Sequence, residues 1–253
     1  MSESRREKIL SDFKELKLGA MRRIYDEVLD RNLKGRKGPE EFLLELLEQE
    51  LAARKVSALN NRIKTARLPQ IKDLDAFKFN ESSVDESVVR RLYSGDFLKE
   101  RKNVVFMGGS GTGKTHLATS IGVNLIRQGY KVRFWNLVDL VNELEREKEQ
   151  NRVGSLQRRM KYFSLIILDE LGYLPFTAQG AQLLFHLMSS WYEHLPVVIT
   201  TNLEFKEWDS MFHNSKMTVA LLDRLTHHCE IVETGMESFR LKARRGEAAE
   251  KNK

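Results

Sequence analysis

One glycine-rich stretch limits the possible folds more than any other feature: Gly108-Gly109-Ser110-Gly111-Thr112-Gly113-Lys114-Thr115. It contains the full G-x-x-x-x-G-K-[ST] pattern, follows an apolar run at 103–107 and precedes an amphipathic stretch at 116–126, so it has the strand–loop–helix context of a phosphate-binding loop. Its four glycines let the backbone curve around a phosphate without Cβ clashes, some of them at positive φ. The loop amides and the helix N-terminus direct positive charge at the β-phosphate. A plain glycine-rich turn would not require lysine and threonine at these positions. The sequence therefore predicts a nucleoside triphosphate site.

Two residues of this loop have predicted chemical roles. Lys114 is placed to reach the β- and γ-phosphates, and the Thr115 hydroxyl is placed to bind Mg²⁺. A second motif lies further along, where the four apolar residues 165–168 are followed by Asp169 and Glu170. Such a run is typical of a buried central strand, and ligands of open α/β sheets lie at the carboxyl ends of strands. We expect Asp169 to contact Mg²⁺ beside Thr115, and Glu170 to orient water or act as a base toward the γ-phosphate.

Strands and helices alternate along this part of the chain. Further strands are predicted at 131–135 and 196–201, and the latter ends at Asn202, which could hydrogen-bond the γ-phosphate or the attacking water. A turn-initiating asparagine is the alternative. Alternating strands and helices favour a parallel sheet covered by helices on both faces, which is an α/β fold.

The first part of the chain has a different pattern. Apolar residues recur at helical spacing from about 2 to 31, the cluster at 34–39 interrupts them, and Pro39 begins a second helix. We predict a helical N-terminal domain at 1–70 for DNA binding or oligomerisation, a connector at 71–100, the ATPase domain at 101–241 and a charged tail at 242–253.

Composition narrows the class of protein. The 253 residues are 41% hydrophobic, no apolar run approaches the ~20 residues of a membrane span, and the N-terminus lacks the apolar core of a signal peptide. Cys229 is the single cysteine, which excludes an intrachain disulfide and fits a reducing cytoplasm. His227 and His228 lack the further ligands of a metal site in the sequence around them, so we expect them to be structural.

The distribution of charge points to a polyanion more clearly than the formal net charge of +6 does. No acidic residue occurs from Leu51 to Lys72, and a second basic patch precedes Tyr162. A solvated helix face usually mixes both signs, whereas a one-sign track suits a phosphate backbone. The candidate DNA contacts are Arg54, Lys55, Arg62, Lys64, Arg67, Arg152, Arg158 and Arg159. They favour contacts to the backbone over reading of base sequence.

Taken together, these motifs resemble the IstB-like ATPases, transposition helpers of an insertion-sequence family within the AAA+ superfamily and relatives of DnaC and DnaA. The resemblance covers nearly the whole chain. The stretches that carry it are 62–67 with 75–77, 113–118, 168–175, Thr201-Asn202 with Trp208, 222–225 and 238–240. The run Asp169-Glu170-Leu171-Gly172-Tyr173-Leu174-Pro175 is its most family-specific part.

The resemblance implies an AAA+ P-loop NTPase with a parallel sheet between helices, a small all-α N-terminal domain, and ATP with Mg²⁺ as cofactors. By it, Asp169 and Glu170 match the Walker B pair, Asn202 matches sensor 1, and Arg224 matches an arginine finger that reaches the neighbouring subunit's nucleotide. By the same resemblance, His116, which directly follows the loop, is expected to belong to the nucleotide site. Arg240 matches a late arginine that acts on the nucleotide in cis or in trans.

The implied function is a homo-oligomeric ATPase on duplex DNA that recruits a transposase and is dismantled by hydrolysis. The segment after the second strand matches a helical insertion that faces DNA, which includes Arg152, Arg158 and Arg159. A DnaC-like helicase loader is the nearer alternative and would prefer single-stranded DNA. A nucleotide or small-molecule kinase is the more distant one and would act as a monomer that ignores DNA.

Overall fold

The computed structural model describes residues 4–173, 175–212, 214–236 and 238–239. The chain forms two compact units, Met1–Asn61 and Arg62–Lys253. Arg240 and the tail predicted at 242–253 lie outside the described residues.

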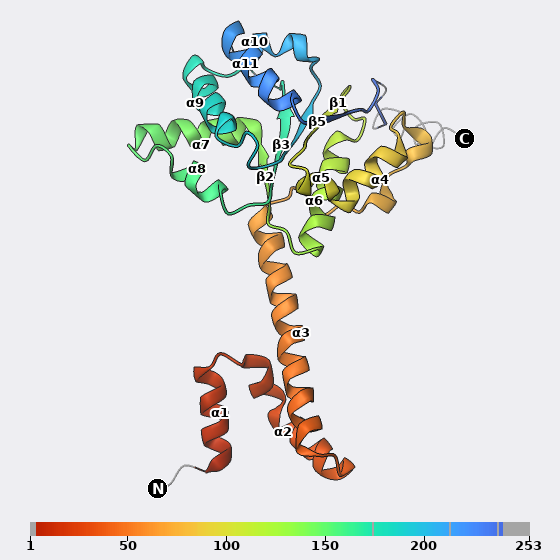
Figure 1. The fold of residues 1–253 in the computed structure, drawn as a ribbon, viewed down its shortest axis with the longest axis vertical. Coiled ribbons are helices and arrows are strands. Elements are labelled where there is room, and N and C mark those ends of the chain that lie inside the picture. Colours follow the sequence, from red (N-terminus) through yellow and green to blue (C-terminus); the bar gives the residue numbers. More distant parts are fainter. Residues whose placement is uncertain (1–3, 174, 213, 237, 240–253) are drawn as a thin grey trace, which may run out of the picture. The chain divides into compact units, whose positions relative to one another are not determined.

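Helices build the first unit (Figure 1): α1 (Arg5–Glu15), α2 (Gly19–Gly35) and most of α3 (Pro39–Ala66). The expectation of one uninterrupted helical run from 2 to 31 was wrong, because the chain turns between α1 and α2, where Lys17 has a φ of 57°. The unit buries a small core of Met21, Tyr25, Val28 and Leu46. Ring contacts at 5.9 Å to Phe13 and 5.8 Å to Phe42 extend that core from Tyr25.

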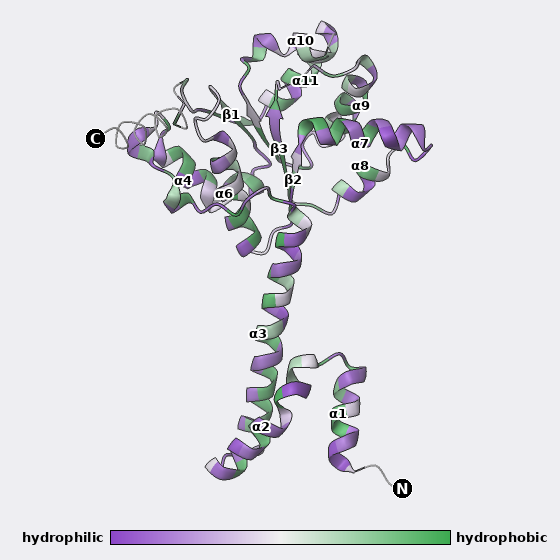
Figure 2. Ribbon diagram, turned by 180° about the vertical axis from the view of Figure 1, so that it is seen from behind, coloured by the Kyte–Doolittle hydropathy of each residue, from purple (hydrophilic) through white to green (hydrophobic). Residues whose placement is uncertain are grey.

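Glu50 on α3 fixes the start of α2. Its carboxylate accepts hydrogen bonds from the backbone N–H groups of Ala20 at 2.8 Å and Met21 at 3.2 Å. These donors belong to the first turn of α2, which has no side-chain cap of its own, so a buried carboxylate satisfies them instead. Elsewhere α3 carries hydrophilic and hydrophobic residues along its length (Figure 2).

A five-stranded parallel sheet forms the centre of the second unit. Its strands are β1 (Asn103–Met107), β2 (Val132–Asn136), β3 (Leu165–Leu171), β4 (Val197–Thr201) and β5 (Cys229–Glu233). Their order is β2-β3-β4-β1-β5, and every pairing is parallel. The three central strands are almost wholly buried, which is why the sequence shows them as continuous apolar runs.

Helices pack on both faces of this sheet (Figure 1). On one side lie α4 (Glu86–Ser94), α5 (Asp96–Lys99) and α6 (Lys114–Arg127). On the other lie α7 (Leu137–Glu149), α8 (Ser155–Met160), α9 (Ala178–Ser189), α10 (Asp209–Phe212) and α11 (Ser215–Thr226). Short 3-10 turns occur at Leu74–Ala76, Phe79–Glu81 and Phe205–Glu207. The predicted α/β class with a helix-covered parallel sheet is confirmed.

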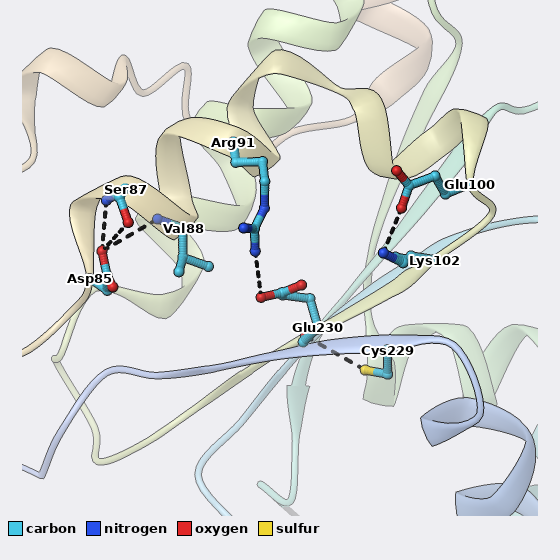
Figure 3. Close-up of polar contacts among 8 residues, drawn as sticks. All are labelled: Asp85, Ser87, Val88, Arg91, Glu100, Lys102, Cys229 and Glu230. Atoms are coloured by element: carbon cyan, nitrogen blue, oxygen red, sulfur yellow. Dashed lines mark hydrogen bonds and ion pairs between the residues drawn. The ribbon is translucent and has the colours of Figure 1, made fainter.

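The segment that precedes β1 is fastened to the last strand (Figure 3). Asp85 caps α4 by accepting hydrogen bonds from the backbone of Ser87 and Val88. Arg91, one turn before the end of the same helix, forms a 2.8 Å ion pair with Glu230 on β5. Residues before the sheet are therefore held against its final strand. Among the described residues, none of the helices is both long and apolar enough to cross a membrane.

Candidate nucleotide site

The phosphate-binding loop has the glycine geometry that its pattern predicts. Gly113 has a φ of 97°, and a Cβ there would lie 2.4 Å from the ring of Phe77. A Cβ on Gly109 would lie 2.6 Å from the carbonyl oxygen of Met236. Neither position has room for a larger residue. The Lys114 ammonium donates to the carbonyl oxygens of Gly108 at 2.7 Å and Gly109 at 2.6 Å, which holds its charge inside the curve of the loop.

Residues after β5 support the loop from behind. The hydroxyls of Thr112 and Thr234 are 2.6 Å apart and buried, and the Thr234 N–H donates to the Met107 carbonyl at 2.8 Å. The Gly109 N–H donates to the Gly235 carbonyl, also at 2.8 Å. The loop is thus held by a segment more than a hundred residues away, and its shape does not depend on its own glycines alone.

Asp169 lies at the centre of the candidate metal site. Its Oδ1 accepts hydrogen bonds from the hydroxyls of Thr115 at 2.9 Å and Thr200 at 2.5 Å. Burial raises the pKa of this carboxyl above its ordinary value, although the two hydroxyls oppose the shift. A hydroxyl and a carboxylate in direct contact are oxygen donors of the kind that Mg²⁺ prefers. The predicted neighbours Thr115 and Asp169 therefore lie where they could hold the ion together.

Glu170 points away from this pair and has a different partner. Its backbone lies in the left-handed region, with a φ of 65°, where the register of β3 against β4 shifts between Leu168 and Leu171. Its side chain is exposed, and its Oε2 accepts a 2.7 Å hydrogen bond from the Asn136 amide at the end of β2. Asn136 also caps α7 through its side-chain oxygen. Sequence reasoning missed Asn136; its position at the end of a predicted strand was the one available signal.

Asn202 follows β4 directly and is exposed. Because β3 and β4 are parallel neighbours, their carboxyl ends meet at the same edge of the sheet, so Asn202 lies on the side of Asp169 and Glu170. Its Oδ1 packs against Gly172, where a Cβ would lie 2.8 Å away. The ring of His116 contacts the connector: its Nε2 lies 3.0 Å from the Asp73 carbonyl, and its ring packs edge-on against Phe77 at 5.5 Å.

Arg224 lies at the opposite end of the strands. It occupies the last turn of α11 and lines a small pocket together with Asn103 and Val197, the first residues of β1 and β4. Its guanidinium donates to the Ser189 hydroxyl at 2.5 Å and lies over the ring of Phe185 at 5.5 Å. The phosphate loop follows the last residue of β1. Arg224 therefore lies a full strand length from the loop of its own chain.

The candidate DNA contacts separate into two groups. Arg54 and Lys55 belong to the first unit, where Arg54 is bound to Glu50 at 2.9 Å. The others belong to the second unit and lie on the last turns of α3, directly after α3, after α7 or on α8: Arg62, Lys64, Arg67, Arg152, Arg158 and Arg159.

Arg133 on β2 was not predicted as a DNA contact, yet it lies near two of the predicted ones, Arg67 and Arg159. Its guanidinium donates to the Thr65 carbonyl at 2.8 Å and lies over the Trp135 ring at 4.6 Å. Burial, with repulsion from Arg67 and Arg159, lowers the pKa of Arg133 to about 10. Three arginines, one directly after α3, one on β2 and one on α8, therefore lie near one another. Carboxylates of Glu143 and Glu147 lie 3.7 Å from Arg159.

Comparison with known proteins places the chain in a family. The family described as "IstB-like ATP binding protein" matches residues 11–247. The chain is 39% identical to the ATP-binding protein of insertion sequence IS5376 from Geobacillus stearothermophilus, over 81% of this chain and 82% of that protein. It is 33% identical to the corresponding protein of IS232 from Bacillus thuringiensis, over 93% of this chain and 95% of that protein.

Among solved structures, DnaA from Aquifex aeolicus superposes with a TM-score of 0.54 at 19% identity, over 66% of this chain and 51% of the DnaA chain. At that identity the likeness shows the AAA+ P-loop fold alone. The sequence relatives support assignment to a particular family, because they align over most of both chains. The chain belongs to the family of IstB-like ATP-binding proteins found in insertion sequences.

Proposed function

We propose that this protein is an ATP-hydrolysing helper of insertion-sequence transposition, which assembles on duplex DNA, engages the transposase of its element and is dismantled by hydrolysis. The observation that carries the proposal is the Thr115–Asp169 contact at the carboxyl edge of the sheet, with Glu170 beside it. This arrangement suits phosphoryl transfer to water, because a hydroxyl–carboxylate pair suited to a metal ion adjoins an exposed carboxylate that can turn toward a nucleophile once it leaves Asn136.

Each residue of the site has a part in that chemistry. The loop amides and Lys114 would bind the β- and γ-phosphates, and Thr115 with Asp169 would hold Mg²⁺, which would supply neutralising charge. Glu170 orients the attacking water once it leaves Asn136. Asn202, which follows the neighbouring strand, positions the γ-phosphate or that water. The contact to Asn136 therefore holds Glu170 in a resting position.

The position of Arg224 supports assembly as part of the mechanism. At the amino ends of the strands it is too far from its own loop to stabilise charge on the γ-phosphate. A second subunit can use it if the subunits pack head to tail, with the amino end of one sheet against the loop of the next. An arginine supplied in this way makes hydrolysis depend on assembly.

Contact with DNA is supported by the one-sign basic track and by the cluster around Arg133. Burying a guanidinium beside two other arginines is unfavourable, and the Glu143 and Glu147 carboxylates, each 3.7 Å from Arg159, offset that repulsion only in part. A backbone phosphate next to Arg67, Arg133 and Arg159 would relieve that repulsion, and such contacts carry no base sequence information. A transposase partner is supported by the insertion-sequence origin of the relatives.

The experiment that tests the proposal is sedimentation of the Glu170→Gln variant with duplex DNA, in ATP, in ADP and without nucleotide. Glutamine keeps the size and the hydrogen bond to Asn136 but does not orient water as a carboxylate does. We expect large assemblies in ATP that persist, whereas wild-type assemblies decay as ATP is consumed. Wild type in ADP or without nucleotide should not assemble, and Glu100→Gln, which changes an exposed carboxylate of the same unit, should behave as wild type.

Three results would contradict the proposal. A monomer in every condition would remove both the trans arginine and the DNA assembly, and would favour a kinase. Assembly on single-stranded DNA only, with capture of a helicase in place of a transposase, would favour a helicase loader. Loss of DNA binding in Glu170→Gln with ATP would show that nucleotide does not drive assembly.

A further inference from the structure

A second cluster of metal-ligating side chains lies at the amino end of the sheet, far from the nucleotide loop. Glu193, His227 and His228 are exposed, and one ligand atom from each lies within 4.8 Å of the others. The sequence led us to expect no third ligand for the two histidines, and the fold supplies Glu193 as a candidate. Glu193 lies 34 residues before His227 in the sequence, so only the fold brings it close.

The backbone that carries the two histidines is fixed by Asn103. Its N–H donates to the His228 carbonyl at 2.7 Å, and its side-chain amide donates to the Leu225 carbonyl at 3.0 Å. Its side-chain oxygen accepts from the N–H of Val197 at 3.1 Å. The end of α11 and the starts of β4 and β5 are therefore held together. The turn that carries Glu193 is held separately, by Arg101, which donates to the Glu193 carbonyl at 2.8 Å.

One histidine of the cluster also has an outer partner. The Tyr192 hydroxyl lies 3.2 Å from His227 Nδ1, which leaves Nε2 of that ring for another ligand. Metal-bound histidines usually have their second ring nitrogen hydrogen-bonded in this way, which orients the ring and fixes its tautomer. The rings of His227 and His228 are 4.3 Å apart, so both face the same small region.

We propose that Glu193, His227 and His228 bind one divalent transition-metal ion of the Zn²⁺ class. Two imidazoles and one carboxylate form a known zinc donor set that leaves a fourth position open. Bonds of about 2.0–2.1 Å would bring the ligand atoms to roughly 3.4 Å from each other, so exposed side chains on a fixed backbone need to move by about an ångström. Hard cations such as Mg²⁺ prefer all-oxygen sites and are not expected to bind here.

The proposed metal site lies close to Arg224. Tyr192, the outer partner of His227, lines the same pocket as Arg224. If the proposed function holds, this surface faces the nucleotide of the next subunit, and the open fourth position is available to a donor from that subunit. Metal binding by the single chain does not depend on that step.

The test is titration of the untagged, chelator-treated full chain with Co²⁺, followed by displacement with Zn²⁺. We expect one equivalent of Co²⁺ to give the visible absorption of a tetrahedral nitrogen–oxygen site, and Zn²⁺ to abolish it. Glu193→Gln, His227→Gln and His228→Gln should each weaken binding by at least about 10–100-fold, and Tyr192→Phe by about tenfold. His194→Gln is the matched control, because His194 is exposed and adjacent to Glu193 but outside the cluster.

Thermal melting provides a second readout that does not depend on ATPase activity. A metal that binds only the folded chain raises the melting temperature, so Zn²⁺ should stabilise wild type and His194→Gln but not His228→Gln. Absence of saturable Co²⁺ binding in wild type, or equal weakening by His194→Gln and His228→Gln, would overturn the proposal. Neither result would bear on assembly of the Glu170→Gln variant with ATP and DNA.

Discussion

Lys114→Ala and Arg224→Ala are each expected to be inactive alone and to restore ATP hydrolysis when mixed. The reason is distance. Arg224 lines a pocket with Asn103, the first residue of β1, whereas the phosphate loop begins at Gly108. The five steps between these two residues, at about 3.3 Å each, span about 16 Å. That span exceeds the reach of an arginine side chain, so under the proposed function one subunit would supply the arginine and another the loop.

The expected magnitudes follow from that geometry. Removing an arginine finger lowers kcat by about 10³-fold or more, so Arg224→Ala alone should be almost inactive. In a random equimolar mixture, about one interface in four pairs an intact loop with an intact arginine, so activity should recover to about a quarter of wild type in a head-to-tail assembly. Steady-state phosphate release with saturating duplex DNA measures this, with sedimentation to confirm that the variants co-assemble.

Arg224 also makes contacts within its own subunit, which calls for controls. Truncation to alanine removes its hydrogen bond to Ser189 and its contact with the Phe185 ring. The loss should lower the free energy of unfolding by about 1–3 kcal/mol. Melting curves separate this loss from catalysis, and Arg90→Ala, which removes an exposed helix ion pair with Glu86, should leave hydrolysis unchanged. A mixture no more active than the sum of its parts, in assemblies shown to contain both chains, would refute the trans arrangement.

Three further predictions concern carboxylates with distinct surroundings. Burial raises the pKa of Asp169, so this side chain favours folding only at low pH and costs stability once pH passes its folded pKa. Asp169→Asn should therefore raise the melting temperature of nucleotide-free protein at pH 8, by about 2–4 °C for each kcal/mol recovered, and the gain should vanish near pH 4; a lower melting temperature at pH 8 would contradict this. Asn136→Asp keeps an N-cap oxygen for α7 but places a like charge beside Glu170, so basal hydrolysis without DNA should rise while the melting temperature stays close to wild type; unchanged turnover would argue against a resting contact. Burial opposes ionisation of Glu50, but hydrogen bonds from Arg54, Ala20 and Met21 outweigh it and hold its pKa below the ordinary value, so its contribution is present at neutral pH and lost as pH falls through the folded pKa. Glu50→Ala should cost the first unit about 1–3 kcal/mol, seen as faster amide exchange at Ala20 and Met21, whereas the exposed Glu48→Ala should change neither.

The sequence allowed prediction of those parts of the fold that depend on neighbouring residues. The strands at 103–107 and 165–168 and the phosphate loop show as local patterns, because a buried parallel strand is apolar throughout and a glycine loop has fixed spacing. The break at Lys17 was missed because no proline or glycine marks the turn before α2 apart from Gly19 itself.

Contacts between distant segments were not predictable in the same way. Asn136 reaches Glu170 because β2 lies beside β3, and nothing in either strand specifies that order. Arg133 resembles any polar residue of an edge strand until α3 and α8 bring Arg67 and Arg159 near it. Glu193 joins His227 and His228 only because β4 and β5 flank β1.

The support that Thr234 and Gly235 give to the phosphate loop also sets an order of events during synthesis. The Thr234 hydroxyl donates to the carbonyl of Met107, 127 residues earlier, so the ribosome completes the glycine loop long before its backing strand exists. At about 5–20 residues per second, that interval lasts roughly 6–25 s. Nascent chains and fragments that end before β5 contain the glycine loop and the residues after β3 and β4. They lack the contacts that Thr234 and Gly235 make behind the loop. We therefore expect chains that end before residues 234 and 235 to hold ATP more weakly than chains that include them, although their nucleotide motifs are the same.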